Sequence, residues 1–537
     1  MHAVKSSWLA TALSTVLVFV SVCNGVVHDV PTQYATIQAA LNATNTGDTV
    51  RVAPGVYHEF LTCTTNSLTL TGWHSADTLA EFRTILDPIP MGLDTPSVAV
   101  FSGDTIQISN FAFYNRPEMR QPDWPTRTGG IHHTGTATFV TNCLFDSVSR
   151  AVYADSYIKA SDSEFRGCLW HCLYASNTGI VQADRCNFDG SRWWLVYGSS
   201  GSTILNCTFR RSEPGGTHLL QLYGQDMLVS GCTFGPSGRG FSLLVISPQG
   251  NCKITDCVFE DVSGTPYLIE VPLNCPVVAD TPIVISNNIF RRYASEGNFG
   301  GTSALGLSCQ TQNAGYFGVV VNNSFHDGST NGVNTSGIAI AGSASLAGNT
   351  FENLLPTTNP DVFASNTLQD TVRAHNNQFL EPGIAAAAGN AYFDARENWW
   401  GDSTGPYHPS LNPEGQGTEV GNGVIFEPWL TVHPDSTDTS SASIERPASL
   451  PVSYSISAYP NPFNATTTLS IHVAKPGEYD VVLFDVTGRE TARLFSGRIV
   501  ATHELQIAAE NYATGVYFVR LQGAGNELAV TKLVLLK

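Results

Sequence analysis

Charged side chains are scarce in this sequence: they make up 13% of its 537 residues, about half of the ~25% that is typical of soluble domains. Basic residues are the scarcer kind, with 27 Lys and Arg against 45 Asp and Glu, which gives a formal net charge of −18. A surface this acidic repels phosphate, so we expect no nucleic-acid partner. It also repels acidic polysaccharides unless a cation or a local basic patch intervenes.

Long apolar runs are missing after the first 25 residues, so the mature chain is predicted to have no transmembrane span. The one long run begins at Trp8, shortly after Lys5, ends at Val22 and is followed by small residues. This order is typical of a secretory signal peptide, which we place at residues 1–25. The sequence therefore predicts a protein that acts outside the cytoplasm.

CxxC pairs are absent although the chain has 12 Cys, and several cysteines belong instead to a repeat. Segments such as VQADRCNF, KITDCVF and VVNNSF recur and end in Phe, and most steps between them span ~20–35 residues, the length of solenoid units. A unit this short cannot bury its own apolar face, so stacked units must share one core. The aromatic residues of the series are Phe145, Phe188, Phe209, Phe234, Phe259, Phe290, Phe325, Phe351 and Phe379, with Phe113 and Phe165 as looser members and Trp400 at the end.

The residue two positions before each Phe is mostly Cys in the first units and Asn in the later ones. On a strand this residue shares a face with Phe, so we expect a buried column along the solenoid, in which stacked Asn amides satisfy one another. The spacing argues against a metal site, and parallel side-chain directions argue against disulfides. The column comprises Cys143, Ser163, Cys186, Cys207, Cys232, Cys257, Asn288, Asn323, Asn349, Asn377 and Asn398.

A corner must precede this column. Both ends of each segment are apolar, and on one unbroken strand they would face opposite sides, so the chain must bend between them. The residue types at the corner tolerate left-handed backbone geometry. They are Asn142, Asn206, Gly231, Asp256, Asn287 and Asn322. Each unit is therefore predicted to consist of two or three short strands joined by tight bends.

The segment YATIQAALNATNTGDTVRVAPGVYHE resembles the N-terminal cap of pectin-lyase-like right-handed parallel β-helix proteins, in which a helix, here Thr36 to Asn42, covers the open end. ENWWGDSTGPYHP followed by VIFEPWL resembles their closing coil. The resemblance implies an all-β fold, a right-handed parallel β-helix of about a dozen coils over residues 26–434. It leaves function open, because this scaffold hosts lyases, hydrolases, binding proteins and adhesins.

The C-terminal segments YPNPFNATTTLSI, GEYDVVLFDVTGRE and YATGVYFVRL resemble the sorting domain of the bacterial type IX secretion system. Residues 435–452, rich in Ser and Thr, are interpreted as a linker, and residues 453–537 as a small Ig-like β-sandwich of about seven strands. The resemblance implies the type IX machinery as a partner. It also implies a secreted location or one on the outer surface of a Gram-negative-type bacterium.

Aromatic residues recur after the turn that follows each Phe. Aligning AVYADS, CLYASN, LVYGSS and LQLYGQD places Tyr153, Tyr174, Tyr197 and Tyr223 in one column, which is predicted to face outward because the neighbouring aliphatic residues suit the interior. Arg150, Trp170, His171, Arg192, Trp193 and Trp194 lie just upstream. An exposed aromatic column beside Arg and His favours binding of an extended extracellular glycan or another cell-surface ligand. The alternative is that stacked tyrosines only cover the strands, as in an adhesin or structural module.

Catalysis is the other hypothesis, as a polysaccharide lyase or a glycoside hydrolase. A lyase needs a base and a group that neutralises a carboxylate, for which Arg150, His171 and Arg192 are weak candidates. A Ca²⁺ ion would serve the same purpose, but no cluster of Asp and Glu is visible to hold it, so no metal or cofactor is predicted. The hydrolase motifs NTD, GHG and RIK are absent, Glu270 stands alone, and the adjacent His132 and His133 point to opposite faces of a strand.

Overall fold

The computed structural model of the chain contains two compact units, residues 1–436 and 437–537, each with its own apolar core. The predicted signal peptide, apart from its last residue, and the predicted linker lie outside the described residues. The structure describes residues 25–73, 84–88, 97–114, 129–168, 170–176, 178–190, 194–211, 218–237, 242–248, 250–264, 266–272, 283–295, 302–308, 318–330, 335–354, 362–364, 371–380, 384–388, 392–434, 455–459, 463–473, 477–485, 489–499, 502–523 and 526–535.

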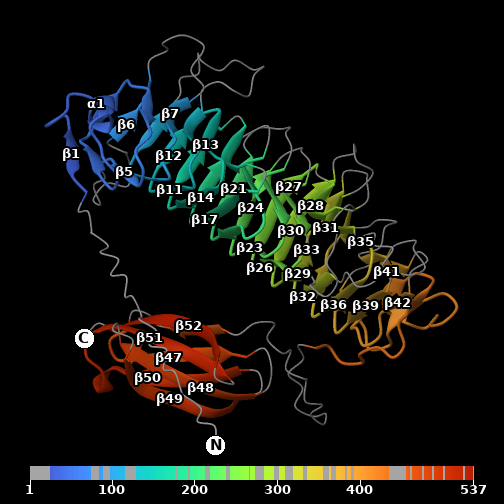
Figure 1. Cartoon of the computed structure of the whole chain (residues 1–537). Coiled ribbons are helices and arrows are strands. Elements are labelled where there is room, and N and C mark those ends of the chain that lie inside the picture. The colour runs from blue at the N-terminus through green and yellow to red at the C-terminus, as the bar shows by residue number, and fades with distance from the viewer. Residues whose placement is uncertain are drawn as a thin grey trace, which may run out of the picture. The chain divides into compact units, whose positions relative to one another are not determined.

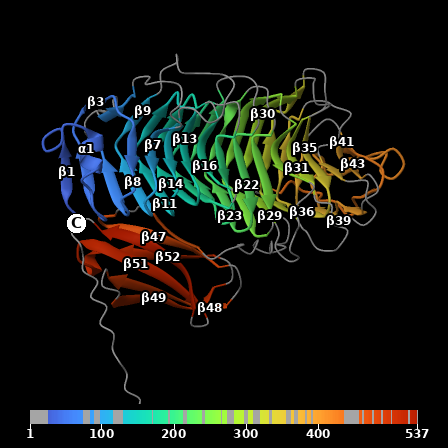
Figure 2. The same cartoon turned by 45° about the horizontal axis from the view of Figure 1, so that its top comes forward.

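The first unit is a solenoid in which every pairing between neighbouring coils is parallel (Figures 1 and 2). Each coil adds one strand to each of three sheets. Sheet 1 contains β1 (Val27–Val30), β2 (Thr49–Val52), β5 (Leu68–Thr71), β8 (Thr105–Ser109), β11 (Ala137–Thr141), β14 (Tyr157–Ser161), β17 (Ile180–Asp184), β20 (Thr203–Leu205), β23 (Met227–Ser230), β26 (Cys252–Thr255), β29 (Ile283–Ser286), β32 (Gly318–Val321), β36 (Ala344–Ala347), β39 (Thr371–His375), β42 (Tyr392–Asp394) and β45 (Val424–Ile425).

Sheet 2 follows sheet 1 around each coil. It contains β3 (Gly55–Tyr57), β6 (Thr84–Leu86), β9 (Ala112–Tyr114), β12 (Leu144–Asp146), β15 (Glu164–Arg166), β18 (Asn187–Asp189), β21 (Thr208–Arg211), β24 (Thr233–Ser237), β27 (Val258–Ser263), β30 (Ile289–Ser295), β33 (Ser324–His326), β34 (Ser329–Thr330), β37 (Thr350–Glu352) and β40 (Gln378–Phe379).

Sheet 3 completes each coil and carries the residues predicted to bind ligand. It contains β4 (Leu61–Cys63), β7 (Ser97–Phe101), β10 (Gly129–His133), β13 (Arg150–Ala154), β16 (His171–Ala175), β19 (Val196–Gly198), β22 (Leu220–Gly224), β25 (Leu244–Pro248), β28 (Tyr267–Val271), β31 (Thr302–Ser308), β35 (Thr335–Ala341), β38 (Val362–Ala364), β41 (Ile384–Ala388), β43 (Pro406–Tyr407) and β44 (Gly417–Val420).

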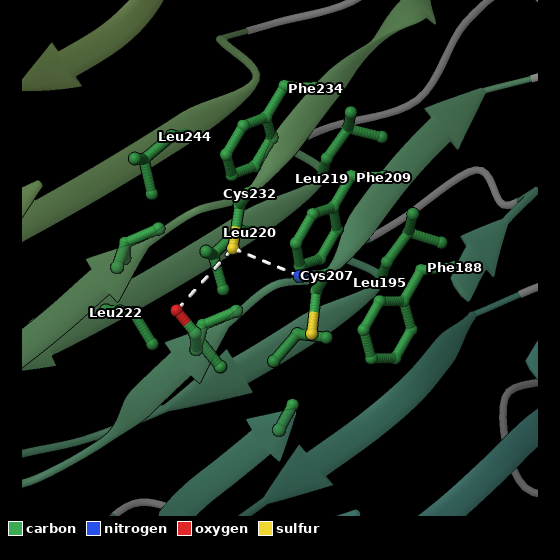
Figure 3. Packing of buried hydrophobic residues seen from close by; sticks show 14 of the residues in the cluster. Phe188, Leu195, Cys207, Phe209, Leu219, Leu220, Leu222, Cys232, Phe234 and Leu244 are labelled. Carbon is green, nitrogen blue, oxygen red and sulfur yellow. Dashed lines mark hydrogen bonds between the residues drawn. The ribbon is translucent and has the colours of Figure 1, made fainter. Parts of the chain in front are cut away.

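The phenylalanine series forms one stack inside the solenoid. From Phe113 to Trp400 successive ring centroids lie 4.7–5.1 Å apart, with planes within 18° of parallel. Figure 3 shows Phe188, Phe209 and Phe234 in this arrangement. The separation matches the ~4.8 Å spacing of strands in a sheet. The predicted series is confirmed, and Phe113 and Phe165 prove to be full members of it.

The buried column of Cys and Asn is also confirmed. The backbone N–H of Cys207 donates to Cys232 Sγ (3.5 Å, Figure 3), and the amide of Asn288 donates to Asn323 Oδ1 (2.9 Å). The same amide-to-amide bond continues from Asn323 to Asn398. The column cysteines are free thiols. The predicted corner residues all have positive φ between 52° and 64°, which Asn, Asp and Gly tolerate best.

A short helix, α1 (Ile37–Leu41), closes the N-terminal end by burying Ile37, Ala40 and Leu41. Thr36 is its N-cap and accepts a bond from the N–H of Ala39 (3.1 Å). The carboxylate of Glu59 accepts from two further N–H groups of its first turn, donors that a helix leaves without partners of its own. Among the described residues no helix is long and apolar enough to cross a membrane.

The described residues of the second unit form an antiparallel β-sandwich with seven strands and a one-turn 3₁₀ helix, Ala509–Asn511. Its core is formed by alternate residues such as Leu469, Val481, Leu483, Val519 and Leu533. One sheet contains β46 (Ser455–Tyr459), β47 (Thr466–His472) and β50 (Thr502–Ala508); the other contains β48 (Gly477–Asp485), β49 (Glu490–Ile499), β51 (Gly515–Gly523) and β52 (Asn526–Leu535).

Candidate functional site

Sheet 3 places three of the predicted ligand-binding tyrosines side by side on its outer face. Tyr153 pairs in register with Tyr174, which pairs with Tyr197. Their neighbours Val152, Leu173 and Val196 are fully buried, whereas the tyrosines are half-buried. We call Tyr153, Tyr174 and Tyr197 the tyrosine row. Each member lies on a different coil. All three face outward because side chains alternate between the two faces of a strand.

The rings of the tyrosine row stack on one another. Centroids lie 5.4 Å apart between Tyr153 and Tyr174 and 5.1 Å apart between Tyr174 and Tyr197, with planes 6° and 18° from parallel. The edge-on ring of His132 covers the far side of Tyr153 at 4.8 Å. The faces within the row are therefore occupied by neighbouring rings, so ring edges and hydroxyls are the groups left for a ligand. In the described part of the chain, none of the three hydroxyls has a protein hydrogen-bond partner.

Tyr223 does not belong to this row, which corrects the alignment made from the sequence. The residue next to Tyr197 is Gln221, because Val196 pairs with Leu220. Tyr223 lies two residues further along β22 and is 43% exposed. A slip of two residues keeps the same alternation of buried and exposed positions, so periodicity could not distinguish the two registers.

A second row lies three residues upstream of the first. Arg150 pairs with His171 in register, and the ring of His171 stacks on that of Trp194 at 5.7 Å. The Nδ1–H of His171 donates to the backbone carbonyl of Trp194 (2.9 Å), so Nε2 is the nitrogen that can accept a hydrogen bond. Burial lowers the pKa of His171 to about 4, and the imidazole is neutral at neutral pH.

Arg150 contributes a positive charge beside the tyrosine row. Its guanidinium carbon lies 5.4 Å from the centroid of the Tyr153 ring, a cation–π distance. Burial lowers the pKa of Arg150, but the group remains charged. Its Nε is buried and has no hydrogen-bond partner in the part of the chain that the structure describes.

The remaining predicted site residues are less central. Trp170 is half-buried and meets His171 edge-on at 6.4 Å, while Arg192 and Trp193 lie outside the described residues. His132 points outward, and His133 points inward, where its Nδ1 contacts Thr138 and its Nε2 contacts the carbonyl of Gly103. The two histidines therefore face opposite sides of β10, as predicted.

Glu270, for which the sequence offered no second carboxylate, contacts a hydroxyl group in the structure. The hydroxyl of Ser242 donates to its carboxylate, and the Nδ1–H of His218 donates to the backbone carbonyl of Ser242 (3.0 Å). The three residues lie about one coil apart in sequence, so only the stacking brings them together. Their connectivity differs from that of a nucleophilic triad, because Glu270 contacts the hydroxyl rather than the imidazole. Among the described residues no group of three or more His, Cys, Asp or Glu is placed to hold a metal ion.

Comparison with known protein families assigns both units. Residues 151–306 match the family described as right-handed beta helix region. Residues 457–536 match the family described as secretion system C-terminal sorting domain. The chain thus contains a right-handed β-helix region and a C-terminal sorting domain, and the sorting domain indicates a secreted or cell-surface protein that the type IX machinery handles. No curated protein matches.

Several solved structures are similar to this chain at low identity and low TM-score. The Agl-KA catalytic domain is 13% identical over 75% of this chain and 68% of its own, with a TM-score of 0.32. Pectin methylesterase PemA from Erwinia chrysanthemi is 12% identical over 51% of this chain and 80% of its own (TM-score 0.25). A GH87 alpha-1,3-glucanase catalytic domain in complex with nigerose is 11% identical over 68% of this chain and 69% of its own (TM-score 0.34).

Proposed function

We propose that this protein binds an extended glycan along the tyrosine row, outside a Gram-negative-type cell from which its sorting domain exports it. The observation that carries the proposal is the row itself: three phenol hydroxyls on successive coils, without protein partners among the described residues and flanked by Arg150. Sugar units of an extended chain advance by a distance comparable to the rise of one coil. A glycan parallel to the solenoid axis would therefore meet one hydroxyl per unit.

The chemistry of the row suits hydroxyl-rich ligands. Burial raises the pKa of Tyr153 and Tyr197, so these phenols are neutral and can both donate and accept hydrogen bonds. Ring edges offer C–H groups rather than π faces, so we expect contacts to be governed by the hydroxyls. The neutral His171 packs against Tyr174 at a tilt of 32°, with ring centroids 4.8 Å apart, and supports the row from the side.

Substitution of Tyr174 tests this proposal. Tyr174→Phe removes a hydroxyl and keeps the stacked ring, so we expect glycan affinity to fall by about three- to tenfold, the value of roughly one hydrogen bond. Tyr174→Ala also disrupts the stack, and we expect it to abolish retention. The measurement is affinity electrophoresis of the purified chain in gels that contain a panel of polysaccharides, followed by calorimetry on the retained one.

Tyr157→Phe is the matched control, because Tyr157 lies in sheet 1 and its hydroxyl is already bonded to Gln182 (2.6 Å). It should leave retention unchanged. Equal loss with the control and with Tyr174→Phe, or no retention on any polysaccharide, would refute binding at the row. Release of unsaturated or reducing ends from a polymer would instead favour a lyase or hydrolase.

A further inference from the structure

A serine, a histidine and a glutamate lie together on the outer face of sheet 2, away from the tyrosine row. Ser324 and His326 are the two ends of β33, on either side of Phe325, which belongs to the buried stack. Because alternate residues face the same side, both polar side chains point outward. Glu352 pairs with His326 in register on β37.

The contacts among these three residues follow the order of a nucleophilic triad. Ser324 Oγ contacts His326 Nε2, and His326 Nδ1 lies 3.4 Å from the Glu352 carboxylate. With the proton on Nδ1, facing the carboxylate, the lone pair of Nε2 is free to accept the serine proton. This is the tautomer that a general base requires. The cluster of Glu270, Ser242 and His218 lacks this order.

The surroundings of the three residues suit a reaction at Ser324. On the other side of His326, the register partner is Arg291, which Glu260 holds through an ion pair of 2.7 Å, so Arg291 does not compete for Glu352. The residue next to Ser324 is Thr350. Thr350 is half-buried, and its hydroxyl is the side-chain donor that we assign to the oxygen on which the ester would develop charge. The backbone N–H of Ser324 is already bonded to Asn288 (2.9 Å) and cannot serve.

We propose that Ser324, His326 and Glu352 form an acyl-transfer site that cleaves short-chain carboxylic esters, such as acetyl esters of carbohydrates. Ser324 Oγ attacks the ester carbon while its proton moves to His326 Nε2. The ester C–O bond then breaks, and the alcohol leaves with that proton. Water, deprotonated by the same nitrogen, then adds to the acyl carbon. The bond from that carbon to Ser324 Oγ breaks as His326 Nε2 returns the proton to Ser324, and the free acid is released. Glu352 is the positioning residue that holds the imidazole.

The site is tested with the purified full-length chain and two probes: a biotinylated fluorophosphonate, located by peptide mass spectrometry, and p-nitrophenyl acetate. We expect the label on Ser324, with acetate release lowered by about 10²-fold or more in Ser324→Ala and His326→Gln. Glu352→Gln should lower the rate by at least about tenfold and shift its pH profile. All three positions are on the surface, so circular dichroism should show unchanged folding.

Ser345→Ala is the matched control, because Ser345 is a half-buried serine of sheet 1 whose register partners are Val319 and Arg373 rather than a histidine. It should change neither labelling nor rate. Label spread over many surface hydroxyls, or a His326→Gln variant as reactive as the wild type, would overturn the proposal. Glycan retention by the tyrosine row does not depend on the outcome.

Discussion

At the scale of single residues, the environment determines the chemistry more than the residue type does. Burial is the main cause that lowers the pKa of four histidines: His132, His133, His171 and His218. The pKa of His171 is lowered most, to about 4, chiefly by burial and further by the charge of Arg150, while the hydrogen bond to the Trp194 carbonyl opposes the shift.

His171 should therefore make stability depend on pH. Its pKa is about 4 in the folded chain, against 6.5 for the ordinary group, so the unfolded state binds the proton first as the pH falls. This contribution to stability is complete above about pH 6.5 and is lost between there and about pH 4, by up to about 3 kcal/mol. Urea unfolding at several pH values, compared between wild type and His171→Gln, measures the difference.

The free energy of unfolding of His171→Gln should fall less steeply as the pH decreases. His132, His133 and His218 still lower it in the same direction. Parallel curves for the two proteins would show that His171 titrates in the folded state as it does in the unfolded one. Trp194 fluorescence is a convenient local signal, because its ring stacks on His171.

At the scale of elements, the buried column of Cys and Asn is stabilised by different interactions in its two halves. Cysteine thiols act as small apolar groups, and burial raises the pKa of Cys143 to about 12, so this thiol stays protonated. The asparagines instead form a chain of hydrogen bonds, in which each Oδ1 accepts from the backbone N–H and the amide of the preceding member.

Replacement in the two halves of the column should thus differ in cost. Asn323→Ala leaves buried donors of Asn288 and buried acceptors such as the carbonyl of Ile285 without partners, and we expect a loss of about 3–5 kcal/mol. Cys232→Ala removes one sulfur atom and its weak hydrogen bond from the N–H of Cys207, and should cost about 1–2 kcal/mol. Thermal unfolding of both variants measures the ranking, and an equal loss would show that the asparagine chain adds nothing beyond packing.

At the scale of the whole molecule, the two units have separate cores, which agrees with a sorting domain that is independent of the domain it exports. A chain that ends at residue 436 should keep a folded β-helix but fail to leave the cell. Fractionation of a type IX-competent host should find the truncated protein in the periplasm and the full chain outside. Equal export of both would show that residues 457–536 are not the signal.

Much of this architecture was predictable because a solenoid repeats one local rule. The positions of Phe145, Cys143 and Asn142 recur in successive coils with similar residue types. Each predicted element was therefore supported by many others. The seven strands of the C-terminal sandwich followed from ordinary alternation and turn residues. The predicted domain boundaries at residues 25, 434 and 452 stay predictions.

The sequence by itself determined the stacked core and the outward direction of Tyr153, Tyr174 and Tyr197, because periodicity encodes which side of a strand each residue faces. The resemblance of its two end segments to known capping coils added the parallel β-helix. Only the tertiary structure decided which coils' residues meet. It placed Gln221 rather than Tyr223 beside Tyr197, and it brought together Ser324, His326 and Glu352. Registers that differ by two residues present the same pattern of buried and exposed positions, and the choice between them depends on turn lengths and on packing across the coil.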